Sequence, residues 1–213
     1  MKAVLVNGSR REKGCTNAAL GIIAGVLHES GIGTELFFIG KKAASGEVGE
    51  VVKAVVEAMK TADALIVGSP VYFASPTGEI VSFLDRLFWT ARDELRFKPG
   101  AAIASARRGG TTATLDVLNK YFLISQMPIV SSCYWNIIHG NTPEEILQDE
   151  EGIQIETSRS FQPPENTTAD AKDFLYKALP MFHVKHQLSP TTQRAPRLNV
   201  AYSMSPHMAS LCE

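Results

Sequence analysis

The sequence predicts a doubly wound α/β fold, in which five parallel strands form one sheet with helices on both of its faces. Short apolar runs alternate along the chain with segments whose apolar residues recur at helical spacing. The run at residues 63–69 is apolar throughout its interior, which is typical of a strand buried on both faces of a parallel sheet. Strands that alternate with helices in this way need crossover connections on both sides of the sheet.

The periodicity also predicts where the individual elements lie. The expected strands cover residues 2–6, 34–39, 63–69, 100–106 and 127–131. The expected helices cover residues 17–29, 51–59, 78–93 and 112–125. The first helix ends before Gly31 and Gly33, the usual glycine signal for a helix C-terminus.

Composition and charge restrict the class of protein. The chain has 213 residues, 45% of them apolar and 20% charged, a balance typical of one globular domain, here with an appendage. The net charge of −1 gives no sign of a nucleic-acid partner. No apolar run approaches membrane-spanning length and no signal peptide is visible, so we expect no membrane association and a cytoplasmic location. Cys15, Cys133 and Cys212 offer neither a disulfide framework nor a C-x-x-C spacing.

The last quarter of the chain differs in composition from the rest. Every glycine lies at or before Gly152, whereas six of the eleven prolines follow it. One short helical candidate, residues 168–179, lies in this part. We therefore predict a domain at residues 1–154 and an atypical C-terminal extension at residues 155–213. This extension is an ordered wrap, a disordered tail or sequence foreign to the original fold.

The first loop, which follows the first strand, has the composition of an anion site. Hydroxyl, amide and glycine residues lead from the strand into a helix, whose free N–H groups and dipole favour a phosphate. Ser9, Thr16 and Asn17 add side-chain donors, and Arg10 and Arg11 add positive charge. The loop lacks the motif G-x-x-x-x-G-K-[ST] of nucleotide-triphosphatase P-loops and also the dinucleotide-binding motif G-x-G-x-x-G. The alternative is an ordinary connection in which Thr16 or Asn17 caps the helix.

Two further loops follow the third and fourth predicted strands. Tyr72 and Phe73 stand between two stiffening prolines, where they would cover a flat heterocycle or merely pack against helices. The segment 105–112 joins two arginines to a glycine pair, which suits either a closely approaching ligand or a simple turn. Because ligands of such sheets bind outside the carboxyl ends of the strands, we expect all three loops to converge on one site.

Together these loops resemble the NADPH-dependent FMN reductase family of flavodoxin-like proteins, over about residues 1–154. The resemblance is carried by Asn7–Ser9, Thr16–Asn17, Gly68–Phe73, Ser75–Gly78, Ala106–Gly110, Met127–Val130 and Tyr134–Asn136. It implies a three-layer flavodoxin-like fold that binds FMN. By this resemblance Ser9, Arg10, Thr16 and Asn17 would bind the FMN phosphate. The isoalloxazine ring would be lined by Pro70, Val71, Tyr72 and Phe73, with Ala106, Arg107, Arg108, Gly109 and Gly110 on its other side.

The reaction that the resemblance implies is hydride transfer from NAD(P)H, as co-substrate, to bound flavin. The electrons would then pass to a small-molecule acceptor such as a quinone or a second flavin. The cofactor carries this chemistry, so we predict no catalytic side chain. The alternatives are a non-catalytic flavin-binding electron carrier and a damaged relative that does not retain flavin. Such carriers tend to be strongly acidic, and the net charge of −1 favours an enzyme.

The sequence departs from its relatives at two places. Some relatives hold an iron–sulfur cluster on cysteines after the second strand, but residues 40–49 contain no cysteine, so we expect no such cluster and no metal. His183 and His186 have helical metal-ligand spacing without an evident third ligand. The extension also lacks an obvious last helix to cover the sheet, and the apolar surface left exposed predicts a homo-oligomer, for example a dimer.

Cys15 is either a thiol of lowered pKa beside the phosphate or a plain small residue.

Overall fold

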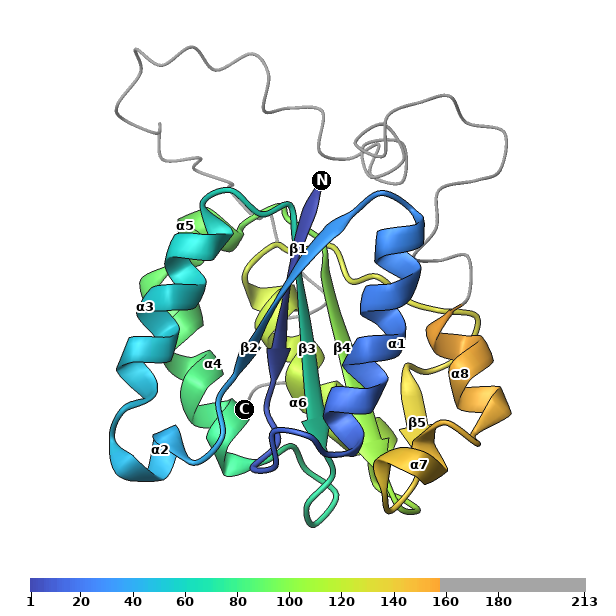
Figure 1. Cartoon of the computed structure of the whole chain (residues 1–213). Helices are drawn as coiled ribbons and strands as arrows, with labels where there is room; N and C mark the ends of the chain where they lie inside the picture. The colour runs from blue at the N-terminus through green and yellow to red at the C-terminus, as the bar shows by residue number, and fades with distance from the viewer. Residues whose placement is uncertain (158–213) are drawn as a thin grey trace, which may run out of the picture. The chain divides into compact units, whose positions relative to one another are not determined.

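The computed structural model describes residues 1–157, which form a three-layer α/β structure around one parallel sheet (Figure 1). The strand order is β2-β1-β3-β4-β5, with all neighbours parallel. The strands are β1 (Lys2–Asn7), β2 (Gly33–Phe38), β3 (Ala64–Pro70), β4 (Gly100–Ala106) and β5 (Ile137–His139). The longer helices are α1 (Cys15–Glu29), α3 (Val48–Met59), α4 (Gly78–Thr90) and α6 (Thr111–Ile124). The shorter helices are α2 (Lys42–Ser45), α5 (Arg92–Leu95), α7 (Pro143–Ile146) and α8 (Glu150–Glu156).

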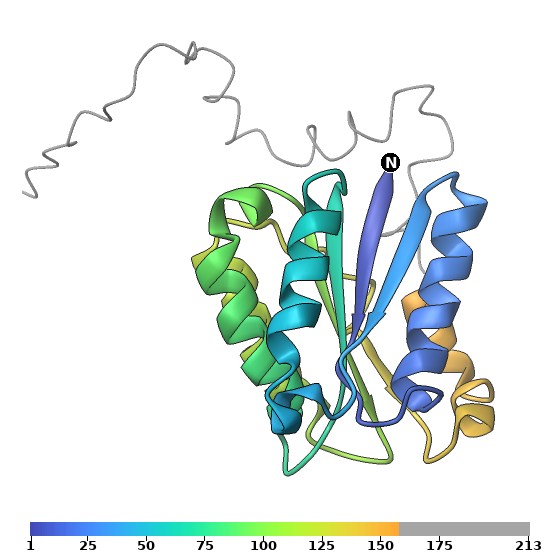
Figure 2. The same cartoon turned by 60° about the vertical axis from the view of Figure 1, so that its left-hand side comes forward.

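The helices divide between the two faces of the sheet, as the doubly wound prediction requires. Buried residues of α3, α4 and α6 form one core with one face of the central strands. Buried residues of α1 and α7 form a second core with the opposite face, and α8 packs against β5 and α1. The two views in Figures 1 and 2 show these groups of helices on either side of the sheet. The predicted five-stranded parallel fold is confirmed.

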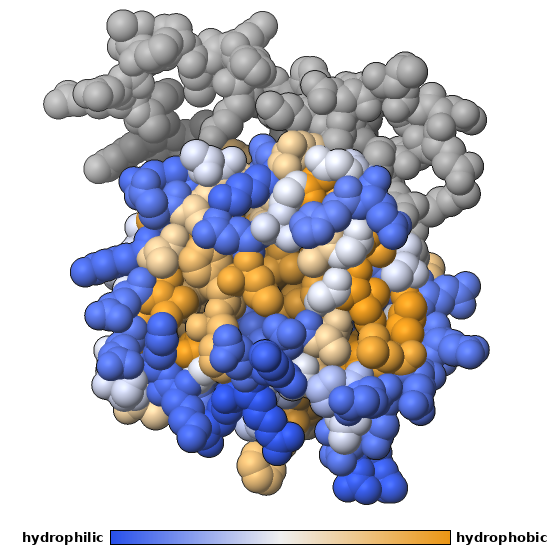
Figure 3. Space-filling model, in the orientation of Figure 1, coloured by the Kyte–Doolittle hydropathy of each residue, from blue (hydrophilic) through white to orange (hydrophobic). Residues whose placement is uncertain are grey.

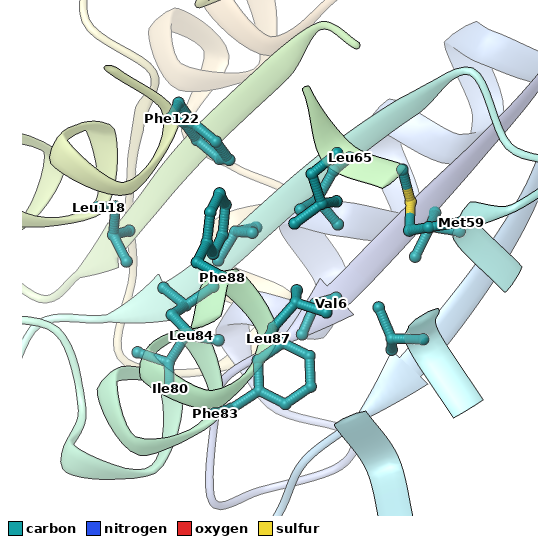
Figure 4. Packing of buried hydrophobic residues seen from close by; sticks show 14 of the residues in the cluster. Val6, Met59, Leu65, Ile80, Phe83, Leu84, Leu87, Phe88, Leu118 and Phe122 are labelled. Carbon is teal, nitrogen blue, oxygen red and sulfur yellow. The ribbon is translucent and has the colours of Figure 1, made fainter. Parts of the chain in front are cut away.

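The core beneath α4 fixes this helix against the sheet (Figure 4). Its apolar stripe, predicted from helical spacing, is buried along its length: Ile80, Phe83, Leu84, Leu87 and Phe88. Phe88 meets Phe122 of α6 edge-on, with ring centroids 5.9 Å apart. Each such side chain contributes about 1.5–3 kcal/mol by its burial. This packing holds the start of α4, and the loop before it, in place.

The predicted fifth strand is wrong in position. Residues 127–131 form only an isolated bridge between Ile129 and Gly100, and the strand itself is β5. The chain leaves the sheet edge after Val130 and rejoins it at Asn136, whose carbonyl accepts the Ala104 N–H at 3.0 Å, so that an insertion of residues 131–135 separates the two pairings. Pro128, which has no N–H, cannot donate to a sheet ladder, and this weakens the segment as a strand.

Smaller differences concern the ends of helices. The helix predicted over 78–93 is α4 followed by the separate turn α5, and α7 and α8 were not predicted. Helix α8 extends across the proposed boundary at residue 154, and the division into two parts stays a prediction. The helix predicted at residues 168–179, and also His183, His186 and Cys212, lie outside the described residues. Within residues 1–157 no helix combines the length and apolarity needed to cross a membrane.

Candidate functional site

The order of the strands reverses between β1 and β3, which is where ligands bind in sheets of this topology. Their carboxyl ends lie at the bottom of Figure 1. Gly8 N–H donates to the Gly68 carbonyl at 2.8 Å, and Thr77 Oγ1 donates to the Gly8 carbonyl at 2.7 Å. A Cβ on Gly8 would lie 2.7 Å from Cβ of Ile80, so this close approach requires glycine. These contacts bind the loops after β1 and β3 to each other.

The start of α1 is shaped as an anion site. Asn7 Oδ1 accepts the Ser9 N–H at 3.0 Å, and Ser9 Oγ accepts the Arg11 N–H at 3.0 Å, so the loop folds back on itself. Gly14 is the N-cap, no described side chain caps the helix, and its first turn contains no acidic residue. The free N–H groups and the dipole of this 15-residue helix therefore favour a phosphate. The alternative in which Thr16 or Asn17 caps the helix is wrong.

The four residues predicted to bind the phosphate differ in their surroundings. Ser9 is buried in the loop, and Asn17 is half-buried in the first turn of α1. Arg10 forms an ion pair with Glu79, with 3.1 Å between Nε and Oε1. Thr16 is buried, and its hydroxyl lies 2.8 Å from Ser105 Oγ in a bond that joins α1 to β4. The Thr16 hydroxyl thus fastens the helix to the sheet, whereas Ser9 and the backbone N–H groups lie at the start of the helix.

The thiol of Cys15 opens α1 but is not activated there. Burial raises its pKa above the ordinary value, an effect larger than the opposing ones of its backbone hydrogen bond and of the Arg11 charge. Its Sγ lies 3.7 Å from the Gly140 carbonyl, to which it donates a weak hydrogen bond. Of the two alternatives for Cys15, the small packed residue fits the structure, and the thiol of lowered pKa does not.

The loop after β3 is a tight, strained turn. Tyr72 and Ser75 exchange backbone hydrogen bonds of 2.8 and 3.1 Å, and the residues between them, Phe73 and Ala74, have φ of 53° and 56°. Two successive positive φ angles are normally adopted by glycine or asparagine, so the turn stores strain. The Phe73 side chain is fully exposed and that of Tyr72 is 44% exposed. Within residues 1–157, Phe73 does not pack against helices, which disfavours the packing alternative for this residue.

The loop after β4 lies directly against this turn. At Gly110, where φ is 92°, an added Cβ would lie 2.8 Å from Ala74 Cα and 2.9 Å from Val71 Cγ1. Val71 N–H also donates to the Ser105 carbonyl at 3.0 Å, since β3 and β4 remain paired up to Pro70. Ala106 ends β4 and is buried, whereas the segment 107–109 is exposed. The structure thus brings the two predicted ring-lining segments side by side.

Several residues that shape the site were not among those predicted to bind. Asn7 organises the first loop, Thr77 caps α4 and bonds to Gly8, and Ser105 bonds to Thr16. A threonine just before an apolar helical repeat is a cap signal that could have been recognised. The contact between Thr16 and Ser105 joins positions 89 residues apart and leaves no local signal.

The outer surface at this edge is polar. Figure 3 shows hydrophilic side chains gathered at the lower end of the molecule, and apolar ones over the middle of the face formed by β2 and its flanking helices. Arg10, Arg11 and Lys13, all in the first loop, are exposed there. Among residues 1–157 no three His, Cys, Asp or Glu side chains are grouped as metal ligands. The described site therefore offers an anion cradle beside two adjoining loops with exposed aromatic side chains, which together fit a phosphorylated ring compound such as FMN.

Comparison with known proteins agrees with this fit. The sequence profile of the NADPH-dependent FMN reductase family matches residues 1–142. An iron–sulfur flavoprotein of Methanocaldococcus jannaschii is 28% identical over 186 residues, covering 76% of this chain and 93% of that protein.

Solved structures show the same fold at lower sequence identity. An NAD(P)H:quinone oxidoreductase from Methanothermobacter marburgensis is similar with a TM-score of 0.58 at 15% identity, over 80% of this chain and 99% of that chain. An NADH:FMN oxidoreductase in its apo form gives a TM-score of 0.58 at 22% identity, over 75% and 86%. The chain therefore belongs to the NADPH-dependent FMN reductase family and is an oxidoreductase of flavodoxin-like fold that binds flavin.

Proposed function

We propose that the protein holds FMN at the carboxyl ends of β1, β3 and β4, oxidises NAD(P)H and reduces a small-molecule acceptor such as a quinone or a second flavin. The observation that carries this proposal is the start of α1, which no side chain of residues 1–157 caps. It lies at the strand-order reversal, beside the touching loops of β3 and β4. The family membership supports the cofactor, and the names of the similar structures support the choice of co-substrate and acceptor.

The phosphate would be bound mainly by backbone. The first turn of α1 offers N–H groups without a described side-chain cap. Ser9 Oγ already accepts the Arg11 N–H, so its hydroxyl hydrogen is free to donate to a phosphate oxygen. Arg10 uses Nε toward Glu79 and has further N–H donors, and Arg11 adds a second positive charge.

The ring would lie against the loops of β3 and β4. Pro70 and Val71 end the strand, Tyr72 and Phe73 present aromatic faces, and residues 106–110 present backbone at close range. When bound, FMN supplies the hydride and electron chemistry. The chain's own part is to orient the ring, to exclude water from one side of it and to keep the loops in place before binding.

A direct test compares FMN with riboflavin on the purified full-length protein. We expect calorimetry to give an affinity for FMN about 10- to 100-fold above that for riboflavin, because charge-assisted hydrogen bonds to the phosphate contribute about 1.5–3 kcal/mol. The flavin-loaded protein should then oxidise NADPH or NADH in the presence of a quinone or ferricyanide. Bound flavin without turnover would favour the electron-carrier alternative. A folded protein that binds no FMN would overturn the proposal.

Self-association belongs to the same proposal. Trp89 on α4 and Leu123 and Ile124 at the end of α6 are large apolar residues with exposed fractions of 88%, 65% and 69%. Arg92, which opens α5 just after α4, donates to the Ile124 carbonyl at 2.9 Å, so the end of α6 adjoins this connection. Such a patch supports the predicted homo-oligomer, which light scattering coupled to size exclusion would measure. The cytoplasmic location stays a prediction from the sequence.

A further inference from the structure

The loop at residues 107–109 has little support from the sheet. The ladder between β4 and β5 ends at the pair Ala106 and His139, followed by one bond from the Gly140 N–H to the Ala106 carbonyl at 3.0 Å. Arg108 lies two residues beyond that point, in an exposed segment that contains Gly109. Glycine loses more conformational freedom on ordering than other residues, so this segment needs a specific contact to stay in one conformation.

The side chain of His139 makes that contact. Its Nε2 lies 2.9 Å from the carbonyl oxygen of Arg108. A carbonyl oxygen only accepts, so Nε2 carries the hydrogen and donates it. Within residues 1–157, His139 is the side chain that forms a hydrogen bond to this segment.

His139 is itself fixed from the other side by Asp149. Asp149 Oδ2 accepts the His139 backbone N–H at 2.6 Å and lies 3.8 Å from its Nδ1. Asp149 Oδ1 accepts the Gly152 N–H at 3.1 Å as the N-cap of α8. A continuous set of contacts therefore runs from α8 through β5 to the carbonyl of Arg108.

We propose that His139 is a positioning residue which, by donating from Nε2 to the Arg108 carbonyl, holds the loop at residues 107–110 in the conformation that receives the flavin ring. This inference rests on the proposed function for the identity of the ligand, but the anchoring itself does not. A loop held in its binding conformation before the ligand arrives lowers the ordering cost of binding.

The first experiment measures the anchor without flavin. Full-length flavin-free protein is treated briefly with trypsin, and the fragments cut after Arg107 and Arg108 are quantified by mass spectrometry. We expect His139→Phe, which keeps a ring but loses the donor, to be cut about fivefold faster, which corresponds to about 1 kcal/mol at 1.4 kcal/mol per tenfold. His139→Gln, whose amide N–H can reach a similar position, should be cut at the native rate.

The second experiment measures FMN affinity of the same variants by calorimetry. His139→Phe should bind FMN about fivefold more weakly and His139→Gln should bind as the native protein does. His28→Phe is the matched control, because His28 bonds to Thr34 Oγ1 at 2.7 Å near the opposite end of the sheet. His139→Ala replaces His139→Phe if the latter does not fold.

The outcomes distinguish the anchoring of the loop by His139 from the effect of that anchoring on FMN binding. A native cleavage rate in the donor-free variant, or equal acceleration in His139→Gln, would overturn the anchor. Faster cleavage with unchanged FMN affinity would overturn the link to the ligand. If the native protein bound no FMN, the proposed function would fail, and the cleavage rates would still decide the anchoring of the loop.

Discussion

The contact between Gly110 and the turn after β3 holds the two predicted ring-lining loops together, and a substitution at Gly110 tests it most directly. We consider the substitution Gly110→Ala. It adds one methyl group at a position where φ is 92°, and it places this group 2.8 Å from Ala74 Cα and 2.9 Å from Val71 Cγ1. The nearer atom belongs to the backbone, so no side-chain rotation relieves the overlap.

The size of the effect follows from two terms. A non-glycine residue at positive φ costs about 1–2 kcal/mol. Overpacking by one methyl group against a fixed neighbour costs about 1–3 kcal/mol. We therefore expect the free energy of unfolding to fall by about 2–5 kcal/mol, a large part of the 5–15 kcal/mol typical of a natural domain. In a chain of this size the melting temperature would fall by about 4–20 °C.

Gly109→Ala is the matched control, since it makes the same chemical change one residue earlier. No atom of residues 1–157 lies within 4 Å of an added Cβ at Gly109, and its φ is not in the positive range. This variant should unfold within about 0.5 kcal/mol of the native protein. Urea unfolding of the flavin-free variants measures both values, and calorimetry with FMN measures the effect on the site. Equal stabilities for the two variants would refute the inferred contact between the loops.

Three further predictions concern buried polar groups. Thr77→Val removes a buried hydroxyl that caps α4 and bonds to Gly8, so urea unfolding should show a loss of about 2–4 kcal/mol. A double-mutant cycle of Thr16→Val and Ser105→Ala should give a coupling of about 1 kcal/mol in the same assay. Glu156 is buried without a described partner, and burial raises its pKa from 4.5 to about 8. Between these values the unfolded chain binds fewer protons, so native stability should fall as pH rises, whereas Glu156→Gln should remove that slope, measured as urea midpoints across this range.

The sheet and its helices could be predicted from the sequence because each element carries its own periodic signal. The stripe from Ile80 to Phe88 repeats at helical spacing and is buried as that spacing requires. The fifth strand could not be predicted in the same way. Met127 and Ile129 give an apolar run of strand type, but the pairing that forms β5 depends on a three-residue segment beyond an insertion. So short a segment has no periodicity to recognise.

The convergence of the three loops could be predicted from the sequence, whereas the direction of each side chain could not. Because parallel strands end at one edge, the convergence of the three loops follows from topology alone. The direction of each side chain does not. Arg10 turns to Glu79 and Thr16 to Ser105, each held by a partner distant in sequence. A residue type shows which bonds are available, whereas the fold decides which partner is close enough to make them.

The candidate site lacks a recognisable nucleotide-binding motif because much of it is formed by backbone. At Gly8 and Gly110 the chain passes too close to its neighbours for a Cβ, and Phe73 and Ala74 adopt positive φ angles. Such features are strained or crowded before any ligand is present, and they are maintained by surrounding contacts such as the Thr77 cap. A site built from preformed backbone can bind a phosphate and a flat ring with many different side chains. We therefore expect changes at these glycines to affect FMN affinity more than changes at the exposed arginines of the same loops.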